Sequence, residues 1–282
     1  MKQDQRYDLL SGNAGAAWSF LLLYGSTGNA RFLQTGEEAI QILLKSAEVQ
    51  EQGIGWRIQE EIPPMSGLAH GNSGILIPIL ALSKYTGRTM YEEIADKTWN
   101  YENSLYNPAI NNWKDTREQG KVVSSNPIGS VAWCHGASGV LYSRILCYEF
   151  AEDKKWKNRL ELDIKRAYKK LKEYWKRDSD SLCHGNCGNL WILKIAQEKM
   201  KEYGISIARN RDVELVKDEL EEQIVHLLPQ EQINFGFMNG YGGILHKYLY
   251  DINVLIVIST LTLQKSYTKR FEYKAISLLA EL

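Results

Sequence analysis

Cys134, Cys183 and His184 are the residues of this 282-residue chain whose types and spacing point most directly to chemistry. Two thiolates and an imidazole form the donor set that a tetrahedral zinc ion favours. The sequence shows no obvious fourth ligand, and three protein ligands with one open position are typical of a catalytic zinc. The pattern therefore predicts one Zn²⁺ at these residues. A pair of buried structural thiols is the alternative, because cysteine is often simply a core residue.

The segments that carry these residues end in a Gly-x-x-Gly pattern that occurs five times. The last glycines, at positions 15, 74, 139, 188 and 243, are spaced by 59, 65, 49 and 55 residues. Apolar, helix-length segments follow the glycine pairs, as in 16–24 and 75–82, and amphipathic segments such as 154–177 and 211–228 lie between them. The pattern predicts an all-α fold of helical hairpins, with inner apolar and outer amphipathic helices, that closes into an α/α toroid or extends as a solenoid.

The glycine pairs also predict where the reactive residues lie. Glycine permits close packing at a helix start, so the pairs are interpreted as packing devices. The residues just before them should then meet at one end of the fold. Pro78 is expected in the first turn of its helix, where its missing N–H does no harm. Thr27–Gly28 and Thr86–Gly87 are predicted helix ends.

Composition excludes several classes of function. Lys plus Arg and Asp plus Glu are equal at 34 each, so no global charge attracts nucleic acid or an anionic membrane. No apolar run approaches the ~18 residues of a membrane span, and the first residues do not resemble a signal peptide. Four cysteines in a chain of this length favour a reducing, cytoplasmic environment over a disulfide scaffold.

The chain resembles the lanthionine cyclase (LanC-like) family and, within it, the C-terminal cyclase domain of class II lanthipeptide synthetases (LanM type). The resemblance covers roughly Tyr7 to Thr260, so residues 1–260 are interpreted as the cyclase domain and 261–282 as a divergent tail. The segments that carry it are 66–71 (SGLAHG), 112–118 (NWKDTRE), 132–136 (AWCHG), 181–185 (SLCHG) and 236–240 (GFMNG).

This resemblance implies a bacterial α/α toroid of seven inner and seven outer helices with one catalytic zinc. The family's metal ligands fall on Cys134, Cys183 and His184. Its acid/base histidine falls on His70, for which a histidine bonded to its own loop is the alternative. An aspartate used in the same chemistry falls on Asp8, for which a helix N-cap or a solvated loop carboxylate is the alternative.

The chain departs from the family in three ways. Stand-alone cyclases have an Arg four residues before the first zinc cysteine and a Tyr just after it, where this chain has Ser130 and His135. Only five of the seven expected repeats are recognisable, and the first matches the family's third. The dehydratase half of class II synthetases is not in this sequence, so the chain resembles an N-terminally truncated fragment that could need the missing segment as a partner.

Several other residues have more than one interpretation. His135, beside a zinc ligand, is expected to orient substrate or ligand as part of the catalytic machinery. Cys187 and Cys147 are interpreted as core residues, although Cys187 could compete as a ligand. Trp113, Asp115 and Arg117 either shape a substrate groove or fix a long loop. His226 and His246 belong to no motif.

The predicted function is zinc-dependent lanthionine or methyllanthionine formation in a dehydrated, leader-bearing precursor peptide. A peptide thiolate would add to dehydroalanine or dehydrobutyrine, and His70 would protonate the resulting enolate. Two alternatives stay open. The first is an enzyme that adds another thiol, such as glutathione, to dehydrated residues. The second is a non-catalytic fragment that binds zinc and peptide, because an incomplete toroid exposes apolar helix faces.

Overall fold

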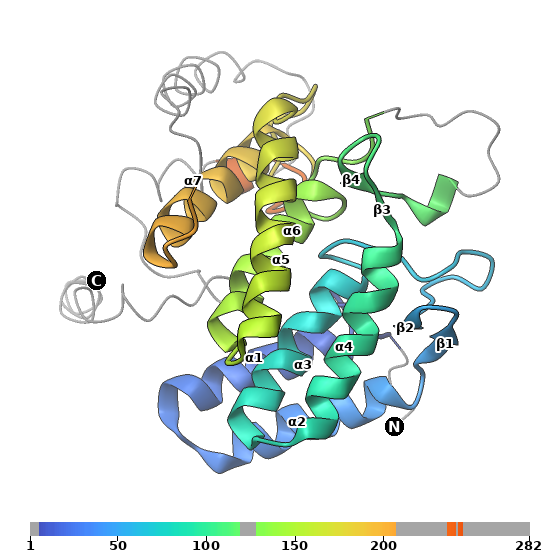
Figure 1. Ribbon diagram of the computed structural model, residues 1–282, viewed down its shortest axis with the longest axis vertical. Coiled ribbons are helices and arrows are strands. Elements are labelled where there is room, and N and C mark those ends of the chain that lie inside the picture. The colour runs from blue at the N-terminus through green and yellow to red at the C-terminus, as the bar shows by residue number, and fades with distance from the viewer. Residues whose placement is uncertain (1–5, 119–127, 207–235, 241, 245–282) are drawn as a thin grey trace.

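The computed structural model describes residues 6–118, 128–206, 236–240 and 242–244, which are mainly helical (Figure 1). The α-helices are α1 (Asn13–Thr27), α2 (Ala30–Leu44), α3 (Asn72–Thr86), α4 (Thr89–Ser104), α5 (Ala137–Phe150), α6 (Lys154–Glu173) and α7 (Asn186–Glu202). Two antiparallel hairpins, β1 (Glu48–Gln50) with β2 (Gly53–Gly55) and β3 (Tyr106–Asn107) with β4 (Asn112–Trp113), and the 3₁₀ turn η1 (Thr116–Glu118) lie in the connections.

The helices form two layers, which confirms the prediction of inner and outer helices in an all-α fold. The hairpins α1–α2, α3–α4 and α5–α6 pack internally, and α1, α3, α5 and α7 contact one another in that order. Every residue of α3 from Asn72 to Leu82 is buried, as its apolar sequence requires. By contrast α6 buries only one face, and lysines such as Lys154, Lys165 and Lys169 are exposed. The expected helix over 211–228 lies outside the described residues.

The inner helices begin at the first glycine of each pair, earlier than the sequence suggested. Gly12, Gly71, Gly136 and Gly185 are the N-caps of α1, α3, α5 and α7. Pro78 therefore lies inside α3, and the expectation that it falls in the first turn is wrong. Both predicted helix ends are confirmed, because Gly28 and Gly87 are left-handed C-caps with φ of 70° and 65°.

The second glycine of each pair packs against the carbonyl oxygen six residues earlier. A Cβ at these glycines would lie 1.9 to 2.6 Å from that oxygen, far inside contact distance. The glycine–carbonyl pairs are Gly15–Leu9, Gly74–Leu68, Gly139–Trp133, Gly188–Leu182 and Gly243–Phe237. The interpretation of the glycines as packing devices is thus confirmed, because each inner helix must approach its own preceding loop too closely for a side chain.

A buried ionic network joins the hairpins beneath the loops. Arg144 of α5 bonds Glu102 of α4 at 2.6 Å and Asp163 of α6 at 2.9 Å, and all three side chains are fully buried. Glu102 Oε1 also accepts hydrogen bonds from the hydroxyl of Ser73, at 2.6 Å, and from the backbone N–H of Gly67, at 3.0 Å. The network therefore fixes one loop, that of Gly67, relative to three helices.

Candidate catalytic rim and metal centre

Five loops that precede the inner helices form one continuous rim. We define the rim loops as residues 6–12, 65–71, 130–136, 179–185 and 236–240. Backbone N–H groups at the same repeat position donate to the next loop, from Leu10 to Ala69, Ala69 to Cys134, Cys134 to Cys183 and Cys183 to Met238, at 2.9 to 3.3 Å. The prediction that the residues before the glycine pairs meet at one end is therefore confirmed for the described loops.

Cys134 and Cys183 are brought together at this rim. Their half-buried thiols share a hydrogen bond, which raises the pKa of Cys134 and lowers the pKa of Cys183, because the first proton leaves more easily than the second. His184 is exposed, and its charge acts on Cys134. The donor types fit a zinc ion in an S₂N set. As the side chains lie, however, no three His, Cys, Asp or Glu residues within the described ranges form a cluster able to hold a metal.

Asp8 and His70 form a second pair on the neighbouring loops. Asp8 Oδ2 lies 2.9 Å from His70 Nδ1, with Asp8 almost buried at 6% exposure and His70 at 43%. The hydrogen bond to Asp8 raises the pKa of His70 above its ordinary value, although burial opposes the rise. Burial alone would raise the pKa of Asp8, but the bonds from His70 and from the backbone N–H of Ser11, at 2.6 Å, hold it below its ordinary value.

His135 lies close to a different aspartate but is enclosed. Its side chain is only 7% exposed, and Nε2 lies 3.5 Å from Asp115 Oδ2. Burial lowers the pKa of His135 to about 4, so the imidazole is neutral at physiological pH. Gly67 packs on this ring, since a Cβ there would lie 2.8 Å from Nδ1. The structure therefore places His135 beside the rim without exposing it to solvent.

Asp115 also holds Arg117 in a two-point ion pair. Arg117 Nε lies 2.8 Å from Oδ1 and Nη2 lies 2.6 Å from Oδ2, while half of the arginine side chain is exposed. Burial favours a higher pKa for Asp115, but the Arg117 bond and the nearby His135 keep that pKa low. The charge of Arg117 also acts on His70 and Cys134. The position of the Asp115–Arg117 pair beside the rim was not predicted from sequence, because the 112–118 motif lies outside the repeat.

The remaining candidates from the sequence belong to the core or lie outside the described residues. Trp113 is fully buried against Tyr106, so it fixes its loop and does not line a groove. Cys147 and Cys187 are fully buried, as interpreted; Cys187 packs with Leu182 and Ile244. His226 and His246 lie outside the described ranges.

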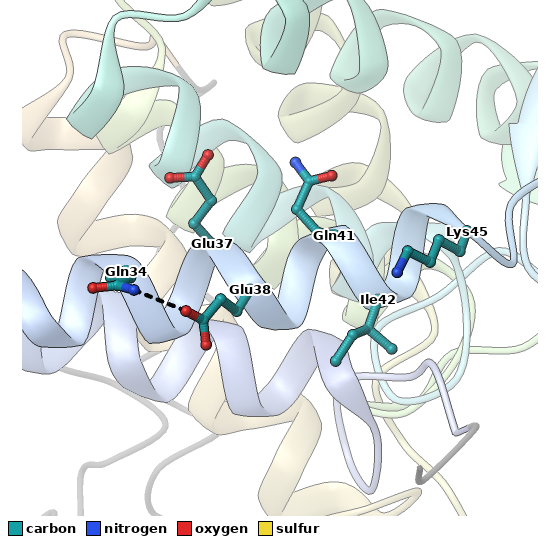
Figure 2. Close-up of a pocket in the computed structure, with 6 residues that line it drawn as sticks. All are labelled: Gln34, Glu37, Glu38, Gln41, Ile42 and Lys45. Carbon is teal, nitrogen blue, oxygen red and sulfur yellow. Dashed lines mark hydrogen bonds between the residues drawn. The ribbon is translucent and has the colours of Figure 1, made fainter.

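A hollow of about 460 Å³ runs along α2 and is lined by Gln34, Glu37, Glu38, Gln41, Ile42 and Lys45 (Figure 2). No rim-loop residue lines this hollow, and its acidic side chains are partly engaged: Glu37 accepts a bond from Tyr91 at 2.6 Å, and Glu38 accepts one from Gln34 at 3.0 Å. It is therefore separate from the candidate site. Among the described helices, none has the length and apolarity needed to cross a bilayer.

An inner and an outer layer of helices with the candidate chemistry on loops at one end define an α/α toroid-type protein. Solved structures of this class match the chain. Nisin cyclase matches with a TM-score of 0.61 and 18% identity, over 91% of this chain and 66% of that chain. Cellobiose 2-epimerase from Spirochaeta thermophila DSM 6192 matches with a TM-score of 0.57 and 12% identity, over 89% and 71%. At such identities these likenesses concern the fold alone.

Residues 1–254 match the family model described as "Lanthionine synthetase C-like protein", and the chain belongs to this family. A relative, the lacticin 481/lactococcin biosynthesis protein LcnDR2 of Lactococcus lactis subsp. lactis, is 30% identical over 254 residues. The alignment covers 87% of this chain and 25% of the relative, so the chain spans about a quarter of that protein's length. The resemblance to class II synthetases is thereby confirmed.

Proposed function

We propose that the chain catalyses zinc-dependent closure of thioether rings in a dehydrated precursor peptide. The observation that carries this proposal is the joining of two reactive pairs on one rim. The Asp8–His70 pair and the Cys134–Cys183 pair lie on consecutive rim loops, linked by the Ala69 to Cys134 backbone bond at 3.0 Å. Membership of the lanthionine synthetase C-like family and the name of the lacticin 481 relative support the same chemistry.

Cys134, Cys183 and His184 would hold the zinc, with the exposed His184 ring turning toward the two sulfurs. When bound, the metal would supply acidification of the substrate thiol, because coordination strongly favours thiolate. Exposure of His184 is consistent with such a turn, since an exposed ring changes rotamer on a timescale of picoseconds to nanoseconds.

His70 would deliver the proton that completes the reaction. Its Nδ1 faces the ionised Asp8, so Nδ1 carries a proton and Nε2 is the atom left to exchange with substrate. The substrate thiolate adds to the β-carbon of dehydroalanine or dehydrobutyrine, forming the C–S bond and an enolate. Protonation of the α-carbon by His70 Nε2 restores the carbonyl. The raised pKa favours the cationic form of His70, which is the form that a general acid requires.

The closing test uses the full chain, Zn²⁺ and the dehydrated precursor of lacticin 481, the peptide family named in the relative. We expect about one zinc per chain and loss of peptide thiols at unchanged peptide mass. Cys183→Ala should abolish both. Cys147→Ala is the matched control, since Cys147 is a buried thiol within α5 and belongs to no rim loop, and this variant should keep the zinc.

The outcomes separate the competing functions. A zinc-loaded protein that binds the peptide without thiol loss would favour a non-catalytic binding protein. Peptide thiols that stay free, with a peptide mass that rises by one glutathione for each addition when glutathione is supplied, would favour the intermolecular addition enzyme. A protein that takes up no zinc, with peptide thiols lost at the background rate, would overturn the proposal.

A further inference from the structure

Ring closure places a negative charge on the substrate, and the loop that follows β4 holds a cation at the rim. When the thiolate adds to the β-carbon, the π electrons move onto the carbonyl oxygen of the dehydrated residue. Preorganised donors at such an oxygen are commonly the largest single contribution to catalysis. The inference below rests on the proposed function and adds a substrate-binding residue to it.

We propose that Arg117, oriented by Asp115, binds the carbonyl oxygen of the dehydrated residue and stabilises the enolate that forms there. The two bonds to Asp115 employ Nε and Nη2, so the Nη1 donors point away from that carboxylate. Half of the arginine side chain is exposed, whereas its aspartate partner is only 11% exposed. The almost buried Asp115 carboxylate fixes the arginine, while the half-exposed guanidinium stays within reach of a substrate oxygen.

The loop of Arg117 is tied to the loop of His70. Thr116 Oγ1 donates to the carbonyl of Pro63 at 3.1 Å, and Ser66 Oγ donates to the carbonyl of Lys114 at 3.3 Å. Lys114 and Thr116 lie just before Arg117 in the sequence, and Pro63 and Ser66 lie a few residues before His70. The arginine and the proposed proton donor are therefore held in a fixed relation.

Asp115 also ties the arginine to the thiol pair. Asp115 Oδ2 lies 3.5 Å from His135 Nε2, and His135 directly follows Cys134. Because Asp115 binds Arg117 and also lies beside the loop that carries Cys134, the arginine is held next to the rim.

The step balances without a further reagent. The C–S bond forms as the Cα=Cβ π bond breaks, and Arg117 donates a hydrogen bond to the resulting enolate oxygen without losing its proton. His70 then gives a proton to Cα, and the carbonyl is restored. The proton lost earlier from the substrate thiol passes to solvent, from which His70 is reprotonated.

The first test compares kcat and KM for ring closure in Arg117→Gln, Arg117→Lys and Asp115→Asn. Arg117→Gln should lower kcat by about a hundredfold, as for loss of one oxyanion donor. Arg117→Lys should recover part of that loss, and Asp115→Asn should lower kcat about tenfold with little change in KM. The control is Arg57→Gln, which breaks a similar ion pair with Glu48 on the β1–β2 hairpin and should leave kcat unchanged. Arg117→Gln activity within threefold of wild type overturns the proposal.

A second measurement keeps the proposal testable if the chain closes no ring. A dehydrated peptide with its cysteines replaced by serine cannot react, yet it presents the same carbonyl oxygen. Binding of this peptide should weaken at least threefold in Arg117→Gln and not in Arg57→Gln. An inactive wild type with Arg117-dependent binding would overturn ring closure but support carbonyl recognition. Binding that is absent, or indifferent to Arg117, would overturn the role of Arg117.

Discussion

His70 and His135 occupy the same position in successive repeats, yet their surroundings are opposite. Each immediately precedes the N-cap glycine of an inner helix, and each lies near an aspartate. His70 is 43% exposed and bonded to Asp8 at 2.9 Å, whereas His135 is 7% exposed and 3.5 Å from Asp115. The pKa of His70 is raised and that of His135 is lowered to about 4.

The backbone explains the difference. The N-caps Gly12, Gly71 and Gly185 have extended backbones with φ between −120° and −129°, whereas Gly136 has φ of 73°. That left-handed φ, which favours glycine, accompanies an isolated bridge between Val131 and Gly136 and an inward His135 ring. The repeat therefore fixes the position of the histidine relative to the inner helix, while the local turn decides whether its side chain is exposed to solvent. Only an exposed histidine can exchange protons with a substrate.

The largest expected effect tests this comparison directly. His70→Gln should lower kcat for ring closure by about 10²- to 10⁴-fold, the usual contribution of a general acid. Its zinc content should stay near that of wild type, because His70 is not among the three residues that would hold the metal. Thiol titration against a dehydrated peptide measures the rate. A His70→Gln variant that closes rings at the wild-type rate would remove the distinction between the two histidines.

The second effect concerns the buried network that bonds Gly67, which lies on the loop of His70 and packs against the His135 ring. Glu102→Ala leaves Arg144 with one buried carboxylate partner, Asp163, and removes the acceptor of the Gly67 N–H. We expect the free energy of unfolding to fall by about 3–5 kcal/mol, as for other broken buried ion pairs. Urea denaturation followed by circular dichroism measures this loss.

Glu48→Ala is the control for the network, because Glu48 pairs with Arg57 at a side-chain exposure of 38%. Exposed pairs contribute at most about 1 kcal/mol, so this variant should unfold near the wild-type midpoint. Equal losses in both variants would show that the network does not secure the loop that carries Gly67 and His70.

The repeat and the convergence of the rim could be predicted from sequence, because both follow from glycine spacing and helical periodicity. The apolar segments before Gly28 and Gly87 are helices that end there, and His70, Cys134 and Cys183 lie on adjoining loops. The start of α3 was placed too late because the glycine pair looked like loop, whereas the second glycine is helical and packs on a carbonyl.

The environment of individual side chains could not be predicted. Asp163 lies on a lysine-rich amphipathic helix, where a carboxylate is expected in solvent, yet it is fully buried against Arg144. The loop of Arg117 is held at the rim by contacts between residues distant in sequence, such as Thr116 with Pro63 and Asp115 with His135. The inward turn of His135 depends on the φ of Gly136, and glycine alone does not specify a left-handed backbone.

A moderate effect is expected when the aspartate of the exposed pair is neutralised. Asp8→Asn removes the charge that raises the pKa of His70, so this pKa should return toward about 6.5. The alkaline limb of the kcat profile should then move to lower pH, and kcat at pH 7.5 should fall by at most about tenfold. A pH series of initial rates measures the shift, and a limb that stays in place would exclude Asp8 as the partner of the acid.

The same pair makes a signed prediction for stability. His70 has a raised folded pKa, so its contribution is complete below about pH 6.5 and is lost as pH rises through that folded value. Asp8 has a lowered folded pKa, so its contribution is present above about pH 4 and is lost as pH falls through the folded value. The melting temperatures of wild type and Asp8→Asn should therefore differ most between these limits and converge outside them.

The smallest effect is expected at the enclosed histidine. His135→Gln removes a neutral ring that hydrogen bonds to the Ser66 backbone, so it should lower the free energy of unfolding by about 1 kcal/mol. Because the His135 pKa is about 4, no group is lost that titrates between pH 6 and 9, and the kcat profile of the variant should keep its shape there. Urea denaturation measures the change in the free energy of unfolding. Initial rates between pH 6 and 9, compared with the Asp8→Asn series, measure the shape of the kcat profile. If the alkaline limb of the kcat profile moved as far in His135→Gln as in Asp8→Asn, the buried His135 ring would take part in proton transfer. The inward position of His135 that accompanies the φ of Gly136 would then be a resting arrangement that opens when peptide binds.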